Sequence, residues 1–153
     1  MAPGNPSVEI FIRRIDPSDT DSAVELVLQL GYNRSAAAVR QWIEELKNSN
    51  DQAAFVACFE DQIAGWIELS VQKRLQSKPY ALIGRLVVRE GLRGRGIGRL
   101  LCLQAERWAW NLGVATVRVT SRSTRVDAHR FYLDAGYRET KTSLVFEKTC
   151  AIE

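Results

Sequence analysis

Apolar residues recur at spacings of three and four in several stretches of the chain, which is the pattern of helices with one buried face. Between Ile97 and Leu112 they fall at positions 97, 100, 101, 105, 108, 109 and 112, and Gly113 follows where a helix commonly ends. Cap and stop residues bound three further predicted helices: from Asp16 to Gly31, from Ser35 to the polar residues 48–51, and from Ser123 or Thr124 to Gly136.

Shorter segments rich in β-branched and aromatic residues predict strands between these helices. The predicted strands are residues 8–15, 53–60, 63–71, 80–88, 116–121, 137–141 and 144–148. A turn at Asp61 and Gln62 joins the second and third strands into a hairpin, and residues 72–79 are expected to form a loop. Gly84 interrupts an apolar run, which predicts a bulge or a close backbone approach in a central strand.

The order of these elements predicts an α/β (α+β) fold built around one mixed sheet. A chain of 153 residues suits one compact domain, and no linker rich in Pro, Gly or Ser divides it. We place this domain at residues 8–149, between a flexible tail at residues 1–7 and a short tail at residues 150–153.

Composition narrows the class of protein. The net charge of +3 does not by itself indicate a nucleic-acid-binding protein. Cys58, Cys102 and Cys150 form no CxxC pair, and their odd number argues against a disulfide framework. No stretch approaches the ~20 apolar residues that would span a membrane. We therefore expect a cytoplasmic protein, and one without a metal site, because a single histidine leaves too few ligands.

The segment from Val87 to Gly98 combines glycine and arginine where a predicted strand passes into the helix that begins at Ile97. The N–H groups in the first turn of a helix lack intrahelical partners and lie at the positive end of the helix dipole, so they attract anions. Glycines let an anion reach the backbone without meeting a Cβ atom. The segment therefore predicts a diphosphate site, with added charge from five arginines: Arg85, Arg89, Arg93, Arg95 and Arg99.

Two common nucleotide-binding motifs fit this segment poorly. A P-loop requires Gly-Lys-Ser/Thr, and here no lysine or hydroxyl residue follows the glycines. A Rossmann fingerprint requires GxGxxG, whereas Gly94, Gly96 and Gly98 give GxGxG, with Arg99 in place of the third glycine. Neither nucleoside triphosphate hydrolysis nor dinucleotide binding is therefore indicated.

Two sequence blocks carry a resemblance to a known family. Residues 93–98 read Arg-Gly-Arg-Gly-Ile-Gly, and residues 128–137 read Ala-His-Arg-Phe-Tyr-Leu-Asp-Ala-Gly-Tyr. They resemble the (Q/R)xxGx(G/A) motif and the AxxFYxxxGF block of the GCN5-related N-acetyltransferase (GNAT) family. Residues 80–147 match the family's pattern well. The earlier hairpin and the two helices before it match only in the order of their secondary-structure elements. The resemblance implies a GNAT-like domain with a mixed, mostly antiparallel sheet, about four helices, and a splayed strand pair that forms the acyl-CoA cleft.

The same resemblance implies an acyl-CoA-dependent N-acetyltransferase with acetyl-CoA as its co-substrate. Backbone groups of residues 86–88 would pair with the pantetheine arm, and the N–H groups of residues 93–98 would hold the CoA pyrophosphate. Arg125 stands where the family often has Asn, so the pantetheine or adenine contacts of that Asn do not carry over to this chain, and Arg125 and Arg130 would instead reach the 3′-phosphate. The expected CoA-binding residues are Leu86, Val87, Val88, Arg93, Gly94, Arg95, Gly96, Ile97, Gly98, Arg99 and Arg125.

The resemblance assigns Tyr132 to protonate the leaving CoA thiolate, a role that suits a phenol with a pKa of about 10. A backbone N–H near Val88 would polarise the thioester carbonyl. The base that takes a proton from the attacking amine is expected to be Glu68, with Tyr80 and Glu90 as alternatives.

Several residues keep a second interpretation. Tyr132 lies near the apolar stripe of its helix and also fits a half-buried core position. His129 fits a surface position, or a position that supports a site residue from behind, better than a catalytic one. Cys58 has no histidine near it in sequence and Cys102 lies off the main helical stripe, so neither is favoured as a nucleophile.

We expect direct acetyl transfer to a primary amine of a small molecule or peptide, in a ternary complex. The acceptor would bind near residues 31–34 and 140–143, which contain no acid cluster of the kind that would mark a polyamine or aminoglycoside site. The alternative function is a CoA-binding sensor or regulatory module without transfer activity. Nucleic acid is not an expected partner, because no aromatic residues interleave with the arginines. A membrane is not an expected partner either, because no apolar stretch is long enough to span one. Pairing of the last strands in a homodimer stays open.

Overall fold

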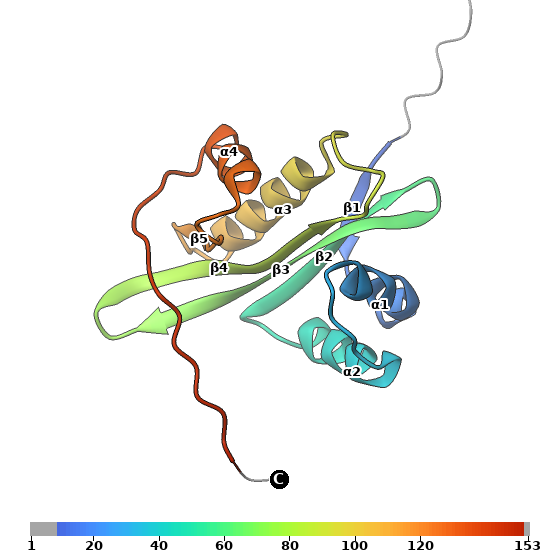
Figure 1. Ribbon diagram of the computed structural model, residues 1–153, viewed down its shortest axis with the longest axis horizontal. Helices are drawn as coiled ribbons and strands as arrows, with labels where there is room; N and C mark the ends of the chain where they lie inside the picture. Colours follow the sequence, from blue (N-terminus) through green and yellow to red (C-terminus); the bar gives the residue numbers. More distant parts are fainter. Residues whose placement is uncertain (1–8, 152–153) are drawn as a thin grey trace, which may run out of the picture. The chain divides into compact units, whose positions relative to one another are not determined.

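The computed structural model describes residues 9–151, and the contacts divide the chain into two units, Met1–Thr120 and Ser121–Glu153 (Figure 1). The first unit contains the strands β1 (Phe11–Arg14), β2 (Gln52–Phe59), β3 (Gln62–Arg74), β4 (Ser77–Val88) and β5 (Val117–Val119). Its helices are the short 3-10 helix η1 (Pro17–Asp19), α1 (Thr20–Gln29), α2 (Ala36–Lys47) and α3 (Ile97–Asn111). The second unit contains α4 (Val126–Asp134).

The five strands form one sheet in the order β1-β2-β3-β4-β5. Neighbouring strands are antiparallel except for β4 and β5, which are parallel. The predicted mixed, mostly antiparallel sheet is therefore confirmed. The bulge predicted at Gly84 is also confirmed, because Glu68 pairs with Arg85 and Leu69 with Ile83, which leaves Gly84 as the extra residue.

The core of the first unit lies on both faces of this sheet. On one face α1 and α2 pack against the strands, and the buried cluster there includes Leu26, Ile43, Val56 and Trp66. Figure 1 shows α3 on the other side of the sheet. The stripe predicted for α3 is buried at Ile97, Leu101, Ala105 and Ala109, whereas Leu100 and Leu112 are exposed. Cys102, predicted off the stripe, is fully buried as well.

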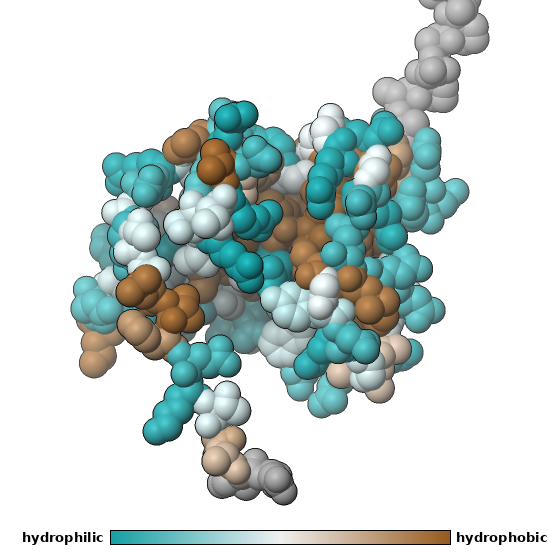
Figure 2. All heavy atoms as spheres, in the orientation of Figure 1, coloured by the Kyte–Doolittle hydropathy of each residue, from teal (hydrophilic) through white to brown (hydrophobic). Residues whose placement is uncertain are grey.

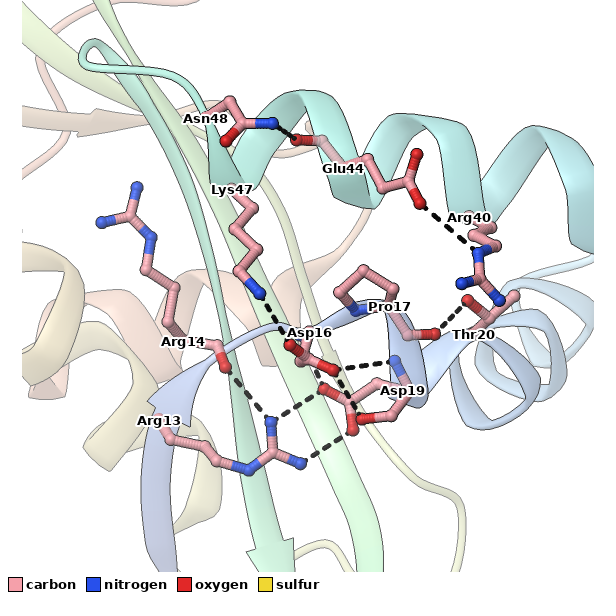
Figure 3. A network of polar contacts seen from close by, with 11 residues as sticks. Arg13, Arg14, Asp16, Pro17, Asp19, Thr20, Arg40, Glu44, Lys47 and Asn48 are labelled. Atoms are coloured by element: carbon pink, nitrogen blue, oxygen red, sulfur yellow. Dashed lines mark hydrogen bonds and ion pairs between the residues drawn. The ribbon is translucent and has the colours of Figure 1, made fainter.

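The chain before α1 is held by a polar network (Figure 3). Asp19 is buried and accepts two hydrogen bonds from the Arg13 guanidinium, at 2.7 and 2.8 Å, and a third from the Asp16 N–H at 2.9 Å. Asp16 accepts from the N–H of Ser18 at 2.9 Å and from Lys47 at 3.0 Å. The predicted cap at Asp16 is therefore confirmed, and its partners come from η1 and α2.

The loop predicted at residues 72–79 was wrong. β3 continues to Arg74 and β4 begins at Ser77, so a tight turn at Leu75 and Gln76 joins two long antiparallel strands. Polar side chains dominate this part of the hairpin, so the sequence shows no apolar alternation. Backbone pairing nevertheless extends the ladder, and Arg74 donates a hydrogen bond to the Tyr80 hydroxyl at 3.2 Å.

The two strands predicted at residues 137–141 and 144–148 were also wrong. The structure gives both segments no regular secondary structure. Leu144, Val145 and Phe146 are 80%, 91% and 88% exposed, and Figure 2 shows exposed hydrophobic surface along this part of the chain. A strand needs a partner ladder as well as a suitable pattern, and no described residue supplies one here.

Other bounds differ by a few residues. β1 and β5 are shorter than predicted, and the fourth helix begins after Arg125 instead of after Ser123 or Thr124. The tail predicted at residues 1–7 lies outside the described residues. The single domain at residues 8–149 stays a prediction.

Candidate functional site

The glycine-rich turn leads directly from β4 into α3. Gly94 and Gly96 adopt φ angles of +79° and +82°, and Gly96 is the N-cap of α3. A Cβ atom built at either glycine would meet nothing within 4 Å, so the space beside this backbone is open. The first turn of α3 contains no acidic residue. The N–H groups at this helix end are therefore available to an outside anion.

The strand before this turn has one unpaired edge. β5 pairs with β4 only at Ala81, Leu82 and Ile83, whereas β4 continues to Val88 along β3. Residues 84–88 therefore have a partner strand on one side only, and β4 and β5 are splayed as the resemblance implied. Leu86, Val87 and Val88 lie on this stretch, immediately before the glycine-rich turn.

Gln29 holds the end of β4, a role that the sequence did not indicate. Its amide N–H donates to the Val88 carbonyl at 3.0 Å, and its amide oxygen accepts from the Glu90 N–H at 2.7 Å. The Val88 carbonyl is thus already hydrogen-bonded. Gly65 supports the same region, because a Cβ atom there would overlap the carbonyl oxygen of Val87. A polar residue at the end of an amphipathic helix gives no signal of such a contact.

The five arginines of the Arg/Gly segment divide by their contacts. Arg89 donates to the Ile63 carbonyl at 2.8 Å and forms an ion pair with Glu25 at 3.0 Å, so it braces the fold. Arg95 lies over the Phe59 ring, with 5.2 Å between the guanidinium carbon and the ring centroid. Arg85 lies over the Tyr32 ring at 5.7 Å. The prediction that all five gather around a diphosphate is therefore wrong for Arg89. Arg93 is exposed in the turn and Arg99 in the first turn of α3.

Glu68 lies on β3, opposite Arg85 of β4 and Ala54 of β2. Its carboxylate accepts a hydrogen bond from the Trp42 indole N–H at 2.9 Å. Glu68 and Trp42 also line a cavity of about 140 Å³ between the sheet and the helices α1 and α2. The other lining residues include Arg34 and a set of apolar side chains: Val27, Val39, Ile43, Leu46 and Trp66.

The two alternative bases have different surroundings. Tyr80 is buried between arginines, with the Arg118 guanidinium carbon 4.2 Å from its ring centroid. The hydrogen bond from Arg74 to its hydroxyl lowers the pKa of Tyr80. Glu90 is exposed beyond the end of β4. Of the three candidates, only Glu68 lines the cavity.

Tyr132 and Arg125 belong to the second unit. Tyr132 is half-buried on α4, and its ring makes an edge contact with the Tyr137 ring, with centroids 5.9 Å apart. Arg125 is exposed and is the N-cap of α4. The ring of His129 hydrogen-bonds to the Arg122 carbonyl at 2.8 Å, which holds the start of this helix.

The cysteines offer no activated nucleophile. Burial raises the pKa of Cys102 to about 12, so its thiol stays protonated at neutral pH. Within residues 9–151, no group of three or more His, Cys, Asp and Glu side chains is placed to hold a metal ion. In the same range, the helices are too short or too polar to cross a membrane.

Comparisons with known proteins agree with this geometry. The sequence model of the Acetyltransferase (GNAT) family matches residues 20–137, a span that includes parts of both units. The aminoalkylphosphonate N-acetyltransferase of Salmonella typhimurium is 29% identical over 146 residues, covering 84% of this chain and 85% of that protein. The aminoglycoside N(6′)-acetyltransferase type 1 of Stenotrophomonas maltophilia is 26% identical over 143 residues, covering 88% and 90%.

Among solved structures, the aminoglycoside N-acetyltransferase AAC(6′)-Iy in complex with CoA superposes with a TM-score of 0.84 at 19% identity. The match covers 95% of this chain and 98% of that one. The chain belongs to the Acetyltransferase (GNAT) family. This membership confirms the predicted fold and the predicted class, an acyl-CoA-dependent N-acetyltransferase with acetyl-CoA as co-substrate.

Proposed function

We propose that this protein transfers the acetyl group of acetyl-CoA directly to a primary amine of a small molecule or peptide in a ternary complex. The observation that carries the proposal is the unpaired edge of β4 running into the open N-terminus of α3. An extended amide chain can pair with a free strand edge, and a pyrophosphate can accept from N–H groups at a helix start. Pantetheine linked to a pyrophosphate has these two features in the same order.

The proposed CoA-binding residues follow from this placement. Leu86 directs its backbone groups to the unpaired edge of β4, where they would pair with the pantetheine amides, and Val88 would contribute only its N–H because Gln29 occupies its carbonyl. Val87 lies between them, but its carbonyl faces Gly65 on β3, so its backbone is directed away from this edge. Backbone N–H groups from Arg93 to Gly98 would surround the pyrophosphate, with Arg93 and Arg99 adding charge. The Arg95 guanidinium lies over the Phe59 ring, so Arg95 would contact the pyrophosphate through its backbone N–H. Arg125 is proposed for the 3′-phosphate.

The chemistry requires one proton acceptor and one proton donor. Glu68 would take a proton from the ammonium group of the acceptor, and the free amine would then attack the thioester carbonyl. The new C–N bond forms, the C–S bond breaks, and Tyr132 would give a proton to the departing thiolate. No covalent intermediate with the enzyme is needed. The relatives named for aminoalkylphosphonates and aminoglycosides support an amine as acceptor.

The test is release of CoA thiol from acetyl-CoA in the presence of a broad set of amines. The wild type is expected to release CoA with at least one amine. Tyr132→Phe and Glu68→Gln are each expected to lower kcat by about 100-fold, the usual contribution of a positioned acid or base. Tyr137→Phe is the matched control for the aromatic contact at Tyr132, and it should keep kcat.

Two outcomes would count against the proposal. Equal kcat values for Tyr132→Phe and the wild type would remove Tyr132 as the acid. Tight acetyl-CoA binding without turnover of any amine would favour a CoA-binding sensor or regulatory module. We also propose a cytoplasmic location, because the cysteines are free in the structure.

A further inference from the structure

One face of the sheet places acidic and basic groups side by side near the cavity. Glu68 and Arg85 are opposite residues on antiparallel strands, so their side chains leave the same face with Cα atoms about 5 Å apart. Arg34 and Glu68 both line the cavity. Arg85 also directly precedes Leu86, where the proposed pantetheine segment begins. An amine held at Glu68 would therefore lie near the thioester.

The arginines on this face differ from those that brace the fold. Arg13, Arg40 and Arg89 form ion pairs with Asp19, Glu44 and Glu25. Within residues 9–151, Arg34 and Arg85 form no ion pair.

Two further arginines, Arg74 and Arg118, lie against Tyr80 on the same face and also have no carboxylate partner in the described chain. Tyr80 is opposite Gln72, four residues along β3 from Glu68, so the positive charges nearest this single lining carboxylate are those of Arg34 and Arg85. An acceptor with several ammonium groups would be repelled by this charge, whereas an acidic group would be attracted.

The cavity adds a requirement for shape. Its volume is about 140 Å³. A cavity of about 150 Å³ with apolar walls holds a molecule of the size of benzene. Apart from Arg34, Trp42 and Glu68, its lining side chains are apolar, so the group that fills it should be a small hydrocarbon side chain or ring.

We propose that the acceptor is a monoamine that carries an acidic group close to the amine and a small apolar side chain. An apolar α-amino acid or its phosphonic acid analogue has this chemistry. The ammonium group binds Glu68, the acidic group binds Arg34 or Arg85, and the side chain enters the cavity. This inference rests on the proposed acetyltransferase function and assigns its acceptor class.

The experiment compares kcat/KM for CoA release across amines that differ by one feature. Leucine and its phosphonic analogue carry all three features, 3-methylbutylamine lacks the acidic group, glycine lacks the side chain, and spermidine carries several ammonium groups. We expect the better of the two acidic leucine compounds to exceed 3-methylbutylamine by about tenfold to 100-fold, the range for loss of a charged hydrogen bond. Spermidine should be the poorest substrate.

Variants of this chain test the two contacts separately. Arg34→Gln combined with Arg85→Gln should raise KM for the acidic acceptor by about tenfold and leave KM for 3-methylbutylamine nearly unchanged. Arg40→Gln combined with Arg107→Gln, at two exposed positions outside the proposed site, removes the same charge and is the matched control. Ala38→Leu should fill the cavity and weaken the leucine compounds relative to glycine, whereas Ala37→Leu, an exposed neighbour on α2, should not.

The outcomes separate this inference from the function on which it rests. CoA release with 3-methylbutylamine or spermidine equal to or better than that with the leucine compounds would overturn the acidic acceptor and leave the acetyltransferase standing. Equal effects of the arginine double variant on acidic and neutral amines would also overturn it. CoA release with none of the amines, despite acetyl-CoA binding, would count against the proposed function itself.

Discussion

Two helix starts in the first unit differ in how their first N–H groups, which have no partner within the helix, are hydrogen-bonded. At the start of η1, which runs directly into α1, Asp16 and Asp19 accept hydrogen bonds from backbone N–H groups, and Arg13 and Lys47 neutralise their charge (Figure 3). Before α3, the cap is Gly96, which has no side chain to offer, and the first turn has no acid. The first helix end is satisfied by the chain itself, and the second is left for a ligand.

The contrast separates stability from binding. A closed helix start stabilises the fold, because its donors are paired before any ligand arrives. An open start gives up that stabilisation and keeps a positive end exposed to anions. Changes at the two sites should therefore affect different measurements: unfolding at the first and acetyl-CoA affinity at the second.

The largest expected effect is on the Kd for acetyl-CoA, when a side chain is introduced that caps the N–H groups at the start of α3. Gly96→Asp would place a carboxylate at the cap, where it competes with the pyrophosphate for the same N–H groups. We expect the Kd for acetyl-CoA to rise by about 100-fold, from lost charged hydrogen bonds and added repulsion. Gly96→Asn also tolerates the left-handed conformation, so it is the matched control for charge, and it should raise Kd by about tenfold. Equal Kd values for the two variants in calorimetric titrations would contradict this account.

Removing the carboxylate that caps the first helix start should lower the stability of the fold and leave the affinity for acetyl-CoA unchanged. Asp19→Asn replaces one carboxylate oxygen with an amide N–H that faces the donors of Arg13 or Asp16. We expect the free energy of unfolding to fall by about 2 kcal/mol, as measured by urea denaturation. The Kd for acetyl-CoA should stay within about twofold, a shift of less than 1 kcal/mol. A larger change in Kd than in stability would break the division between the two helix starts.

Loss of the cap at the start of α2 should also lower the stability of the fold, by a smaller amount. The Ser35 hydroxyl accepts from the Ala38 N–H at 3.1 Å and caps α2. Ser35→Ala should lower the free energy of unfolding by about 1 kcal/mol. Ser35→Thr keeps the hydroxyl and should lose less. An equal loss in both variants would indicate that the cap hydrogen bond is not the cause.

The smallest effect is a pH dependence at Asp16. Hydrogen bonds from the N–H and hydroxyl of Ser18, with a further one from Lys47, lower the pKa of Asp16 below its usual value of 3.8. A lowered carboxyl pKa contributes stability above pH 3.8 that is lost as the pH falls below it. Asp16→Asn should therefore be less stable than the wild type at pH 7, and the gap should narrow toward pH 2. Urea midpoints that keep a constant gap over this range would contradict the assignment.

The sequence predicted features that depend on local pattern. The glycines at 94 and 96, the cap at Asp16 and the bulge at Gly84 each follow from the conformations that a few neighbouring residues allow. Features that depend on partners distant in the chain were missed or misassigned. Nothing near Gln29 indicates that it holds the end of β4, and nothing near Arg89 indicates its ion pair with Glu25.

The errors in the strands have the same origin. The long β3–β4 hairpin forms through backbone pairing between polar segments, which hydrophobic alternation does not reveal. Residues 144–148 show a suitable strand pattern and have no ladder partner among the described residues. The candidate base Glu68 was identified by residue type, but its contact with Trp42 and its place in the cavity required the fold.

The most direct test of the central claim is a calorimetric comparison of two truncated cofactors with the wild-type protein. Acetyl-dephospho-CoA keeps the pyrophosphate and the adenosine, and S-acetylpantetheine lacks both. Gly96→Asp should therefore reduce the difference between the two compounds if the pyrophosphate causes it. The open start of α3 predicts micromolar binding of the first and a Kd at least about 100-fold higher for the second, because several charged hydrogen bonds are lost. Similar Kd values for both compounds would contradict the claim that this helix start binds the pyrophosphate.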